Sequence, residues 1–323
     1  MKFPRLFGAL ALLSVLTGPT CAQDWPTRPL RIVVPFPAGG SADTQSRVIA
    51  EELAKALGQP VLVDNRPGAG GNIGAAEAAR SQPDGYTLFL ATTATHASNV
   101  SLYKKLPFDP ARDFAPLTLV TVNPQVIVAG TKVQELDLDG LVARLKTAGA
   151  AANFGSSGIG SATHLAGELF NRETGSALVH VPYRGQGPAL NDLLGGQLDV
   201  MFPLVADVFA LVQGGRLHAF AILGERRSQA LPGVPTTAEL GRPRLALSPI
   251  WTALYTVAGT PQPVIDRLHR ELVRIIRSPQ FTQRLESSGY EVRTSTPEEL
   301  AAFAAAETVK WGEVIRSLDV RLD

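Results

Sequence analysis

The sequence predicts an α/β protein of two lobes with a cleft between them. Short apolar strands alternate with helices over residues 31–90, and the same alternation returns over 117–222. Such alternation is typical of mainly parallel sheets that carry helices on both faces. A chain of 323 residues is long enough for two such units, and no flexible linker separates them. We therefore expect strands to run directly from one lobe to the other.

The first array begins with a predicted strand over 31–36, which is apolar and rich in β-branched residues, as buried strands are. A turn of small residues follows, and then a helix that ends at Gly58. Either Ser41 or Asp43 is predicted to cap this helix. The rest of the array comprises a strand over 61–63, a helix from about 73 to 80 and a strand over 86–90.

The second array contains more elements, and most of them are shorter. They are extended segments at 117–120 and 126–128, helices at 141–148, 161–174, 188–194 and 208–212, and strands at 153–154, 178–181, 199–202 and 217–222. An extended run at 250–255, helices at 263–277 and 297–318 and a short strand at 290–292 complete the chain.

Two extended stretches, 118–128 and 247–256, are predicted to cross between the lobes. If the C-terminal segment returns to the first unit, lobe 1 comprises 23–121 plus 249–323, and lobe 2 comprises 122–248. Small ligands bind in clefts at the carboxyl ends of parallel strands. The predicted site therefore lies in the cleft that the crossing strands span.

The first 22 residues are predicted to be a cleaved secretory signal peptide. Lys2 and Arg5 precede a short apolar run, and small residues precede a cut after Ala22. The run is too short to span a bilayer. Cleavage removes Cys21, the single cysteine of the chain. Cysteine catalysis and thiolate metal sites are therefore excluded for the mature protein.

The charge balance gives no sign of a nucleic acid or an anionic membrane as a partner. The chain has 30 basic and 29 acidic residues, and the loss of Lys2 and Arg5 moves its net charge from +1 to −1. No run of five or six like charges occurs. The apolar faces of the helices are accounted for by the cores of the lobes, so we expect a monomer.

The motifs with the clearest enzymatic chemistry are missing from the sequence. It has no Walker phosphate loop, no His-Glu-x-x-His, no Gly-x-Ser-x-Gly and no dinucleotide-binding glycine motif. No two of the five histidines are spaced three or four residues apart, so the sequence predicts no metal site and no cofactor. A remote alternative is a secreted hydrolase that uses Ser157 or Ser161 with His164, supported only by their adjacency.

Two turns that join a strand to a helix have the composition of anion sites. In residues 36–43, Gly39 and Gly40 leave backbone N–H groups accessible at a helix N-terminus, where the helix dipole favours an anion. Residues 155–164 repeat the pattern in the second array, with Ser161 as the N-cap. A plain turn with a capping side chain is the alternative for each of them.

Two further segments place polar groups after a strand. Thr92 and Thr93 bring hydroxyl groups to the end of the third strand, where they either meet a ligand or satisfy their own turn. Arg184 follows a strand of the second array and is able to pair with a carboxylate, while Tyr183 closes the pocket. A solvated arginine is the alternative there.

Several multi-residue motifs occur in the order of a known family. They occupy residues 29–43, 65–74, 83–88, 158–170, 181–185, 189–202 and 258–261. In these motifs the sequence resembles the tripartite tricarboxylate transporter substrate-binding proteins, the Bug-type receptors. The resemblance covers essentially the whole mature chain.

The resemblance implies a non-catalytic periplasmic binding protein of type II, the Venus-flytrap fold, whose lobes close on a small organic acid. It implies membrane transporter subunits as partners. The ligand residues that it implies are Phe36, Ala38, Gly39, Gly40, Ser41, Asp43, Thr92, Thr93, Ser156, Ser157, Gly160, Ser161, His164, Tyr183 and Arg184. One carboxylate would rest on the 36–43 loop, with Asp43 shaping that loop or meeting a polar ligand group. The ligand's distal group would meet the 156–164 loop.

The sequence departs from the family pattern at one position that bears on the ligand. Pro203 stands where an acidic residue or asparagine is frequent. A ligand amino group would be expected to need that acid, so a dicarboxylate or an aromatic carboxylate is favoured over an amino acid. The same fold also serves as a sensory subunit that presents its ligand to a signalling receptor, and the sequence does not separate the two roles.

Overall fold

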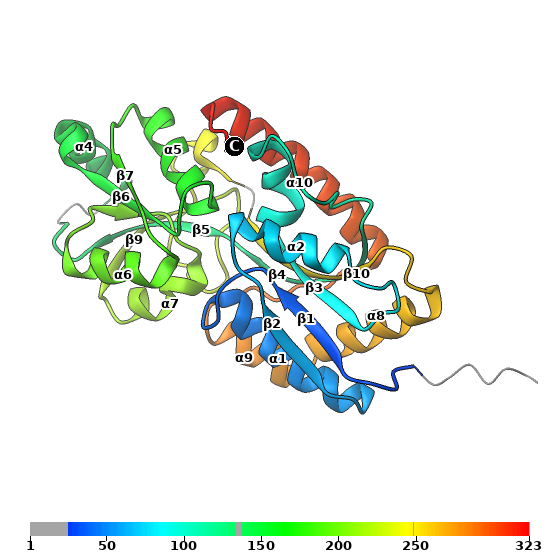
Figure 1. Ribbon diagram of the computed structural model, residues 1–323. Coiled ribbons are helices and arrows are strands. Elements are labelled where there is room, and N and C mark those ends of the chain that lie inside the picture. The colour runs from blue at the N-terminus through cyan, green and yellow to red at the C-terminus, as the bar shows by residue number, and fades with distance from the viewer. Residues whose placement is uncertain (1–24, 134–136, 248, 323) are drawn as a thin grey trace, which may run out of the picture.

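In the computed structural model, described over residues 25–133, 137–247 and 249–322, the chain forms two five-stranded sheets with helices on their faces. Figure 1 shows the two sheets as separate lobes joined by neighbouring stretches of chain. This confirms the predicted two-lobed α/β class. The predicted signal peptide and Cys21 lie outside the described residues. No helix in the described ranges combines the length and apolar character needed to cross a bilayer.

The sheet of the first lobe has the strand order β2-β1-β3-β10-β4. Its strands are β1 (Leu30–Val34), β2 (Val61–Asn65), β3 (Thr87–Thr92), β4 (Phe114–Asn123) and β10 (Ile250–Val257). Strands β1, β2 and β3 are parallel as predicted, but β10 runs antiparallel to both β3 and β4. The sheet is therefore mixed, because β10 enters from the second lobe rather than through a crossover helix.

The sheet of the second lobe has the strand order β7-β6-β8-β5-β9. Its strands are β5 (Gln125–Gly130), β6 (Asn153–Ser156), β7 (Val179–Pro182), β8 (Val200–Met201) and β9 (Leu217–Leu223). Strand β5 is antiparallel to β8 and β9, whereas β6 is parallel to β7 and β8. The second sheet is mixed for the same reason, since β5 arrives from the first lobe.

Helices cover both faces of each sheet (Figure 1). The helices of the first lobe are α1 (Ser41–Leu57), α2 (Asn72–Ala79), α3 (Asn99–Leu102), α8 (Gln262–Ile276), α9 (Pro279–Glu286) and α10 (Pro297–Leu318). Those of the second lobe are α4 (Leu138–Ala148), α5 (Ala162–Thr174), α6 (Gln186–Gly195) and α7 (Val205–Gln213). One buried cluster combines α1, α8 and α9 with their sheet, and another combines α6 and α7 with theirs.

A third buried cluster runs from one lobe into the other. It includes Trp251 on β10 and Ile315 on α10 as well as Phe154 and Phe170 of the second lobe. Helix α10 packs on α5, and Figure 1 shows its C-terminal half reaching across to that helix. Strands β4 and β5 are separated by Pro124 alone, so the first crossing is direct as predicted. The lobe boundaries at 121/122 and 248/249 stay predictions.

Some local predictions are wrong. Helix α1 has Gly40 as its N-cap, without a capping side chain, instead of Ser41 or Asp43. The segment 290–292 forms one isolated bridge, between Thr121 and Val292, and not a strand. Helices α3 and α9 and the π-helical turn Ala94–Ser98 were not expected. All three are short, so their apolar residues span too few helical turns to show a clear period in the sequence.

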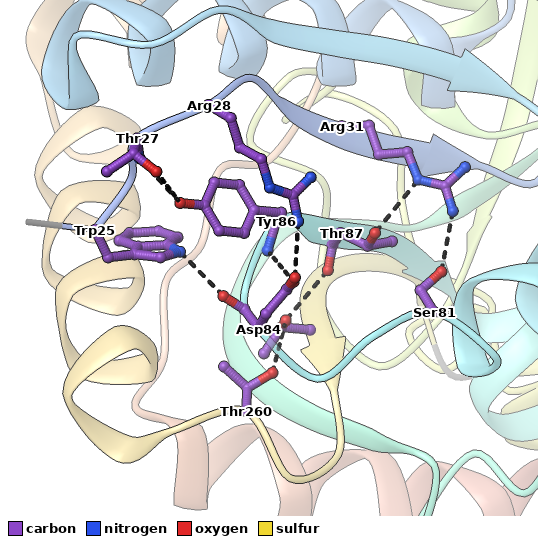
Figure 2. Close-up of polar contacts among 10 residues, drawn as sticks. Trp25, Thr27, Arg28, Arg31, Ser81, Asp84, Tyr86, Thr87 and Thr260 are labelled. Carbon is purple, nitrogen blue, oxygen red and sulfur yellow. Dashed lines mark hydrogen bonds and ion pairs between the residues drawn. The ribbon is translucent and has the colours of Figure 1, made fainter. Parts of the chain in front are cut away.

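The chain ahead of β1 is held to the first lobe by a polar network (Figure 2). The indole N–H of Trp25 donates to the Asp84 carbonyl at 3.0 Å, and the Asp84 carboxylate accepts from Arg28 at 2.8 Å. The Tyr86 hydroxyl accepts from the Thr27 backbone N–H at 2.9 Å. These contacts fix the start of the described chain beside the turn that leads into β3.

Replacing Tyr86 with phenylalanine tests this anchor. We expect Tyr86→Phe to lower the free energy of unfolding by about 1 kcal/mol, because the Thr27 N–H loses its acceptor while the ring keeps its packing against Trp25. The control is Thr27→Val, which removes only the longer 3.3 Å hydroxyl contact. Urea denaturation measures both, and equal effects of the two variants would contradict this assignment.

Candidate functional site

The loop between β1 and α1 ends in a helix N-terminus that no side chain caps. Gly40 is the N-cap with extended backbone angles (φ −82°, ψ 173°), and no side chain of the described residues caps the first turn. Gly39 has φ +85°, a conformation that favours glycine. The first N–H groups of a helix have no partner within the helix. Residues 40–42 therefore present backbone donors and the positive end of the helix dipole to an anion.

Asp43 holds the shape of this loop from inside. Its side chain is almost fully buried, and its carboxylate accepts hydrogen bonds from the Gly39 N–H at 2.9 Å, Arg47 Nε at 2.9 Å and Asn65 Nδ2 at 3.0 Å. Burial alone would raise the pKa of Asp43, but these hydrogen bonds outweigh it and lower the pKa below the usual value. Of the two roles predicted for Asp43, these contacts favour the shaping of the loop.

The two threonines at the end of β3 differ in whether their hydroxyl groups already have a hydrogen-bond partner. Thr93 Oγ1 accepts a hydrogen bond from the Trp251 backbone N–H at 2.9 Å, so it ties β3 to β10. Thr92 Oγ1 is buried and has no hydrogen-bond partner among the described residues. A buried hydroxyl without a partner is costly. Thr92 is therefore better placed than Thr93 to donate to a ligand.

The second predicted loop, between β6 and α5, is hydrogen-bonded mainly to itself. Ser161 caps α5 as predicted, since its hydroxyl accepts from the His164 N–H and donates to the Gly158 carbonyl at 2.6 Å. Ser157 contacts Thr163 through its N–H and its hydroxyl. The Gly160 N–H donates to His164 Nδ1 at 3.2 Å. This network gives the loop a fixed shape.

Two residues that the sequence analysis did not single out complete this loop. His180 on β7 lies with Nε2 2.6 Å from Ser156 Oγ, and its ring stacks on His164 with centroids 4.1 Å apart. Glu168, four residues after His164, has its carboxylate 3.6 Å from His164 Nε2. Burial and the neighbouring His164 lower the pKa of His180 to about 4, so its ring is neutral at neutral pH. The i, i+4 spacing of His164 and Glu168 was visible in the sequence, whereas the approach of His180 was not.

The ligand atoms of His164, Glu168 and His180 all lie within 4.8 Å of one another, the arrangement of a possible metal site. The hydrogen bonds of His164 oppose that use. Because Nδ1 of His164 accepts from the Gly160 N–H, the neutral ring carries its proton on Nε2, the atom that faces Glu168. A metal would have to displace that proton. The cluster is therefore better suited to fixing the loop than to holding a metal ion.

Tyr183 and Arg184 stand at the edge of the second lobe. The Tyr183 hydroxyl donates to Asp192 Oδ2 at 2.6 Å, which turns it toward α6. Burial, together with Asp192, raises the pKa of Tyr183 to about 12, so it remains protonated at neutral pH. Arg184 is exposed. The Gly158 position lies next to the Tyr183 carbonyl, which puts both residues beside the second loop.

The second loop contacts the first lobe directly. A Cβ at Gly160 would lie 2.7 Å from side-chain atoms of both Leu102 on α3 and Leu322 near the C-terminus. The structure thus brings the 156–164 loop against the lobe that carries the α1 loop. Two cavities, of about 660 and 860 Å³, lie elsewhere, and none of the predicted ligand residues lines either of them.

A polar network in the first lobe, at the end where the crossing strands leave it, was not foreseen from the sequence. Gln45, one turn into α1, accepts from Thr252 Oγ1 at 2.7 Å and Thr121 Oγ1 at 3.3 Å. Asn123 extends the network, since its Nδ2 donates to Thr121 Oγ1 at 2.9 Å. These side chains sit where β4 and β10 leave the first lobe, so they join the α1 loop to the crossing strands.

The chain is similar to receptors of one transport family. Residues 45–320 match the model of the tripartite tricarboxylate transporter family receptor. The protein BugT of Bordetella pertussis is 37% identical over 326 residues, which is the whole of both chains.

The chain is also similar in fold to solved structures. An R. palustris protein with adipate is 30% identical with a TM-score of 0.86, covering 92% of this chain and 99% of the other. MatC from Rhodopseudomonas palustris, with bound malate, is 33% identical with a TM-score of 0.82, covering 90% of this chain and all of the other.

Proposed function

The chain belongs to the tripartite tricarboxylate transporter receptor family, and from this premise we propose that it captures a small organic acid between its lobes for delivery to a transporter of that family. Members of the family are periplasmic substrate-binding proteins and not enzymes, and this chain is a binding protein of the same kind. The proposed ligand is a dicarboxylate or an aromatic carboxylate. The proposed partners are the integral membrane subunits of the transporter, met by a monomeric receptor.

The uncapped N-terminus of α1 is the observation that carries this proposal. A helix end with accessible N–H groups and no capping side chain is suited to a carboxylate, because it offers charge-assisted hydrogen bonds without an opposing buried charge. The buried Thr92 hydroxyl, at the carboxyl end of the strand next to β1, is proposed as a further donor. Relatives with similar folds hold adipate and malate, which are both dicarboxylates.

The predicted ligand residues fall into two groups on this account. Ala38, Gly39, Gly40, Ser41 and Thr92 belong to the open helix end and are proposed to bind the first carboxylate. The residues of the second loop are hydrogen-bonded mainly within that loop, which favours a rigid wall that closes over the ligand; they are Ser156, Ser157, Gly160, Ser161 and His164. Phe36, Tyr183 and Arg184 keep the roles that the resemblance implies. Asp43, Thr93 and His164 are proposed to act mainly by holding those loops.

The other functions considered have less support. A serine hydrolase needs an accessible hydroxyl bonded to an imidazole. Of the two predicted serines, Ser161 donates to the Gly158 carbonyl and Ser157 contacts Thr163, while His164 Nδ1 accepts from the Gly160 N–H. The Ser156 hydroxyl does lie 2.6 Å from His180 Nε2, but Ser156 is fully buried. A sensory role for the same receptor is distinguished by deleting the protein and comparing uptake with induction. We propose export to the periplasm after cleavage at Ala22, which N-terminal sequencing of the secreted protein tests.

A thermal-shift screen tests the binding proposal. The mature chain, residues 23–323, is unfolded, refolded to remove any copurified ligand, and screened against mono-, di- and tricarboxylates, aromatic acids and amino acids. At a concentration 100 times Kd, a ligand stabilises by about 2.7 kcal/mol, and we expect a rise in Tm of about 5 °C with a dicarboxylate or an aromatic acid.

The variant Ser161→Ala accompanies the screen. Loss of the N-cap lowers stability by about 1 kcal/mol without ligand, so the readout is the ligand-induced shift and not Tm itself. We expect this shift to shrink in the variant because the second loop loses its fixed shape. A flat screen of the refolded wild-type protein, or stabilisation by amino acids alone, would contradict the proposal.

A further inference from the structure

Gln125 lies at the first crossing between the lobes. It is the first residue of β5 and follows Pro124 directly. The chain here runs beside the segment that follows β8, because the Val126 N–H donates to the Pro203 carbonyl at 2.9 Å. The Val205 N–H donates back to the Pro124 carbonyl at 3.0 Å. Gln125 is therefore fixed at the carboxyl end of β8, the kind of position where α/β sheets bind ligands.

The side chain of Gln125 contacts the start of α5. Its Nε2 donates to the Ala162 carbonyl at 3.2 Å and to the Phe202 carbonyl at 2.8 Å. Ala162 is the first residue of α5 and directly follows the second loop. These two hydrogen bonds hold the amide between the end of β8 and the start of α5, beside the loop that is proposed to close over the ligand.

A polar face of the crossing chain connects Gln125 with α1. Thr121, Asn123 and Gln125 stand at alternate positions, and side chains at alternate positions of an extended chain share one face. Asn123 Nδ2 donates to Thr121 Oγ1 at 2.9 Å, and Thr121 Oγ1 lies 3.3 Å from its acceptor on Gln45 of α1. The face thus begins at α1 and ends at the start of α5. Gln125 therefore lies on the same side of the crossing as the helices that carry both loops of the candidate site.

The orientation of the Gln125 amide is fixed by its partners. Nε2 uses both of its hydrogens on carbonyl oxygens, and a flipped amide would place Oε1 against those two oxygens. Oε1 is buried and has no hydrogen-bond partner among the described residues. The residue is only 1% exposed, and a buried acceptor without a donor is costly. Oε1 is thus the atom of Gln125 that a ligand can satisfy.

The polar side chains of the second loop are engaged elsewhere. Ser161 donates to the Gly158 carbonyl at 2.6 Å, and Ser157 contacts Thr163. Pro203 brings no polar side chain to this edge. A neutral amide oxygen accepts a hydrogen bond from a hydroxyl group, whereas it repels carboxylate oxygens and binds an ammonium group less well than an acid does. A hydroxyl group carried by the ligand is therefore the donor that suits this position.

We propose that Gln125 is a specificity-determining residue of the cleft, whose Oε1 accepts a hydrogen bond from a hydroxyl group of the bound organic acid. One carboxylate of the ligand then rests at the N-terminus of α1, and the hydroxyl group faces the second lobe. This inference rests on the proposed function and narrows its ligand class to hydroxy-substituted acids. An acid without the hydroxyl group leaves Oε1 unsatisfied, so it binds about tenfold less tightly.

Calorimetric titration with matched acids measures this preference. Malate and succinate share a carbon chain and differ by a hydroxyl group, and 2-hydroxyglutarate and glutarate make the same comparison with a longer chain. We expect the wild-type mature chain to bind the hydroxy acid of at least one pair about tenfold more tightly than its partner. In Gln125→Met, which keeps the length of the side chain without its amide, the two acids of that pair should bind within about twofold of each other.

The readout is the ratio of the two affinities, because loss of the Nε2 hydrogen bonds weakens the binding of both acids alike. The control is Asn171→Leu, toward the other end of α5. The Asn171 amide donates to the Leu178 carbonyl and accepts from the Leu178 N–H, both at 3.0 Å, so this variant also removes an amide that ties two segments of the second lobe. It should lower stability and leave the ratio as in the wild type.

The ¹³C resonance of the Gln125 side-chain carbonyl tests the same contact in the wild-type protein, whatever the stability of the variants. We expect it to move downfield at saturation with the preferred hydroxy acid and to stay in place with the matched acid, since only the hydroxyl group donates to Oε1. A resonance that the hydroxy acid leaves unmoved overturns the inference.

Equal wild-type affinities within both pairs also overturn it, and they are the result expected if a water molecule satisfies Oε1. A preference that persists in Gln125→Met, or binding of other organic acids but of neither hydroxy acid, overturns it as well. In each of these cases the proposed function still stands. A refolded protein that binds no organic acid at all contradicts the proposed function, and this inference with it.

Discussion

Asp43→Ala is expected to lower the free energy of unfolding by about 3 kcal/mol and to weaken ligand binding at least tenfold. The buried carboxylate accepts three hydrogen bonds, and its removal leaves the Gly39 N–H and the Asn65 amide without that acceptor. The glycine turn then loses the contact that sets the direction of the first N–H groups of α1. Urea denaturation and calorimetry measure the two effects.

The stabilisation that Asp43 contributes depends on pH with a defined sign. Because the pKa of Asp43 is lowered in the folded protein, its stabilisation is present above pH 4 and is lost as the pH falls through the folded pKa. Asp43→Asn should therefore reduce the difference in stability between pH 6 and pH 3. The control is Asp137→Ala, which removes the exposed N-cap of α4, costs about 1 kcal/mol and should leave binding unchanged. Undiminished affinity in Asp43→Ala would contradict the role given to the loop.

Gly167→Ala is expected to destabilise the second lobe by about 2 to 3 kcal/mol. Gly167 lies within α5, and a Cβ there would be 2.1 to 2.5 Å from three ring atoms of Phe154. The Phe154 ring is fully buried and packs against both His180 and Phe202, so it has little room to move away. The alanine therefore forces a shift of α5 or of β6, the two elements that carry the second loop.

The matched control is Gly187→Ala on α6. Apart from the chain neighbours and the backbone of α6 itself, no atom of the described residues lies within 4 Å of the added Cβ there. Alanine is also the better helix former, so stability should rise by up to about 1 kcal/mol. Opposite signs for the two glycines are the expected outcome of urea denaturation. Equal effects would mean that close packing between α5 and β6 is not the cause.

Elements with strong local signals were predicted well. Helix α10 has the predicted bounds, because the capping box of Thr296 with Glu299 and the proline after Thr296 mark its start. Helix α1 ends at Gly58 in a left-handed conformation, as a glycine C-cap predicts. The direction of β10 and β5 was not predictable in this way, because it depends on where the chain crosses between the lobes and not on the residues of the strands.

The same division applies to the candidate site. The α1 loop is contiguous in sequence, so its glycines and helix start could be recognised directly. The wrong cap shows the limit of that reasoning. The side chains of Ser41 and Asp43 are capable of capping, but Ser41 is already the first helical residue after Gly40, and Asp43 points toward Gly39, Arg47 and Asn65. Gln45 and His180 join the site through contacts between distant segments, which no local pattern reveals.

Backbone amide resonances of the mature chain during a titration with adipate test the central claim most directly. The account predicts that the N–H signals of residues 40–42, at the N-terminus of α1, show the largest saturable downfield shifts, because a bound carboxylate accepts their hydrogen bonds. Large shifts confined to residues around the two other cavities, with the signals of residues 40–42 unchanged, would contradict it.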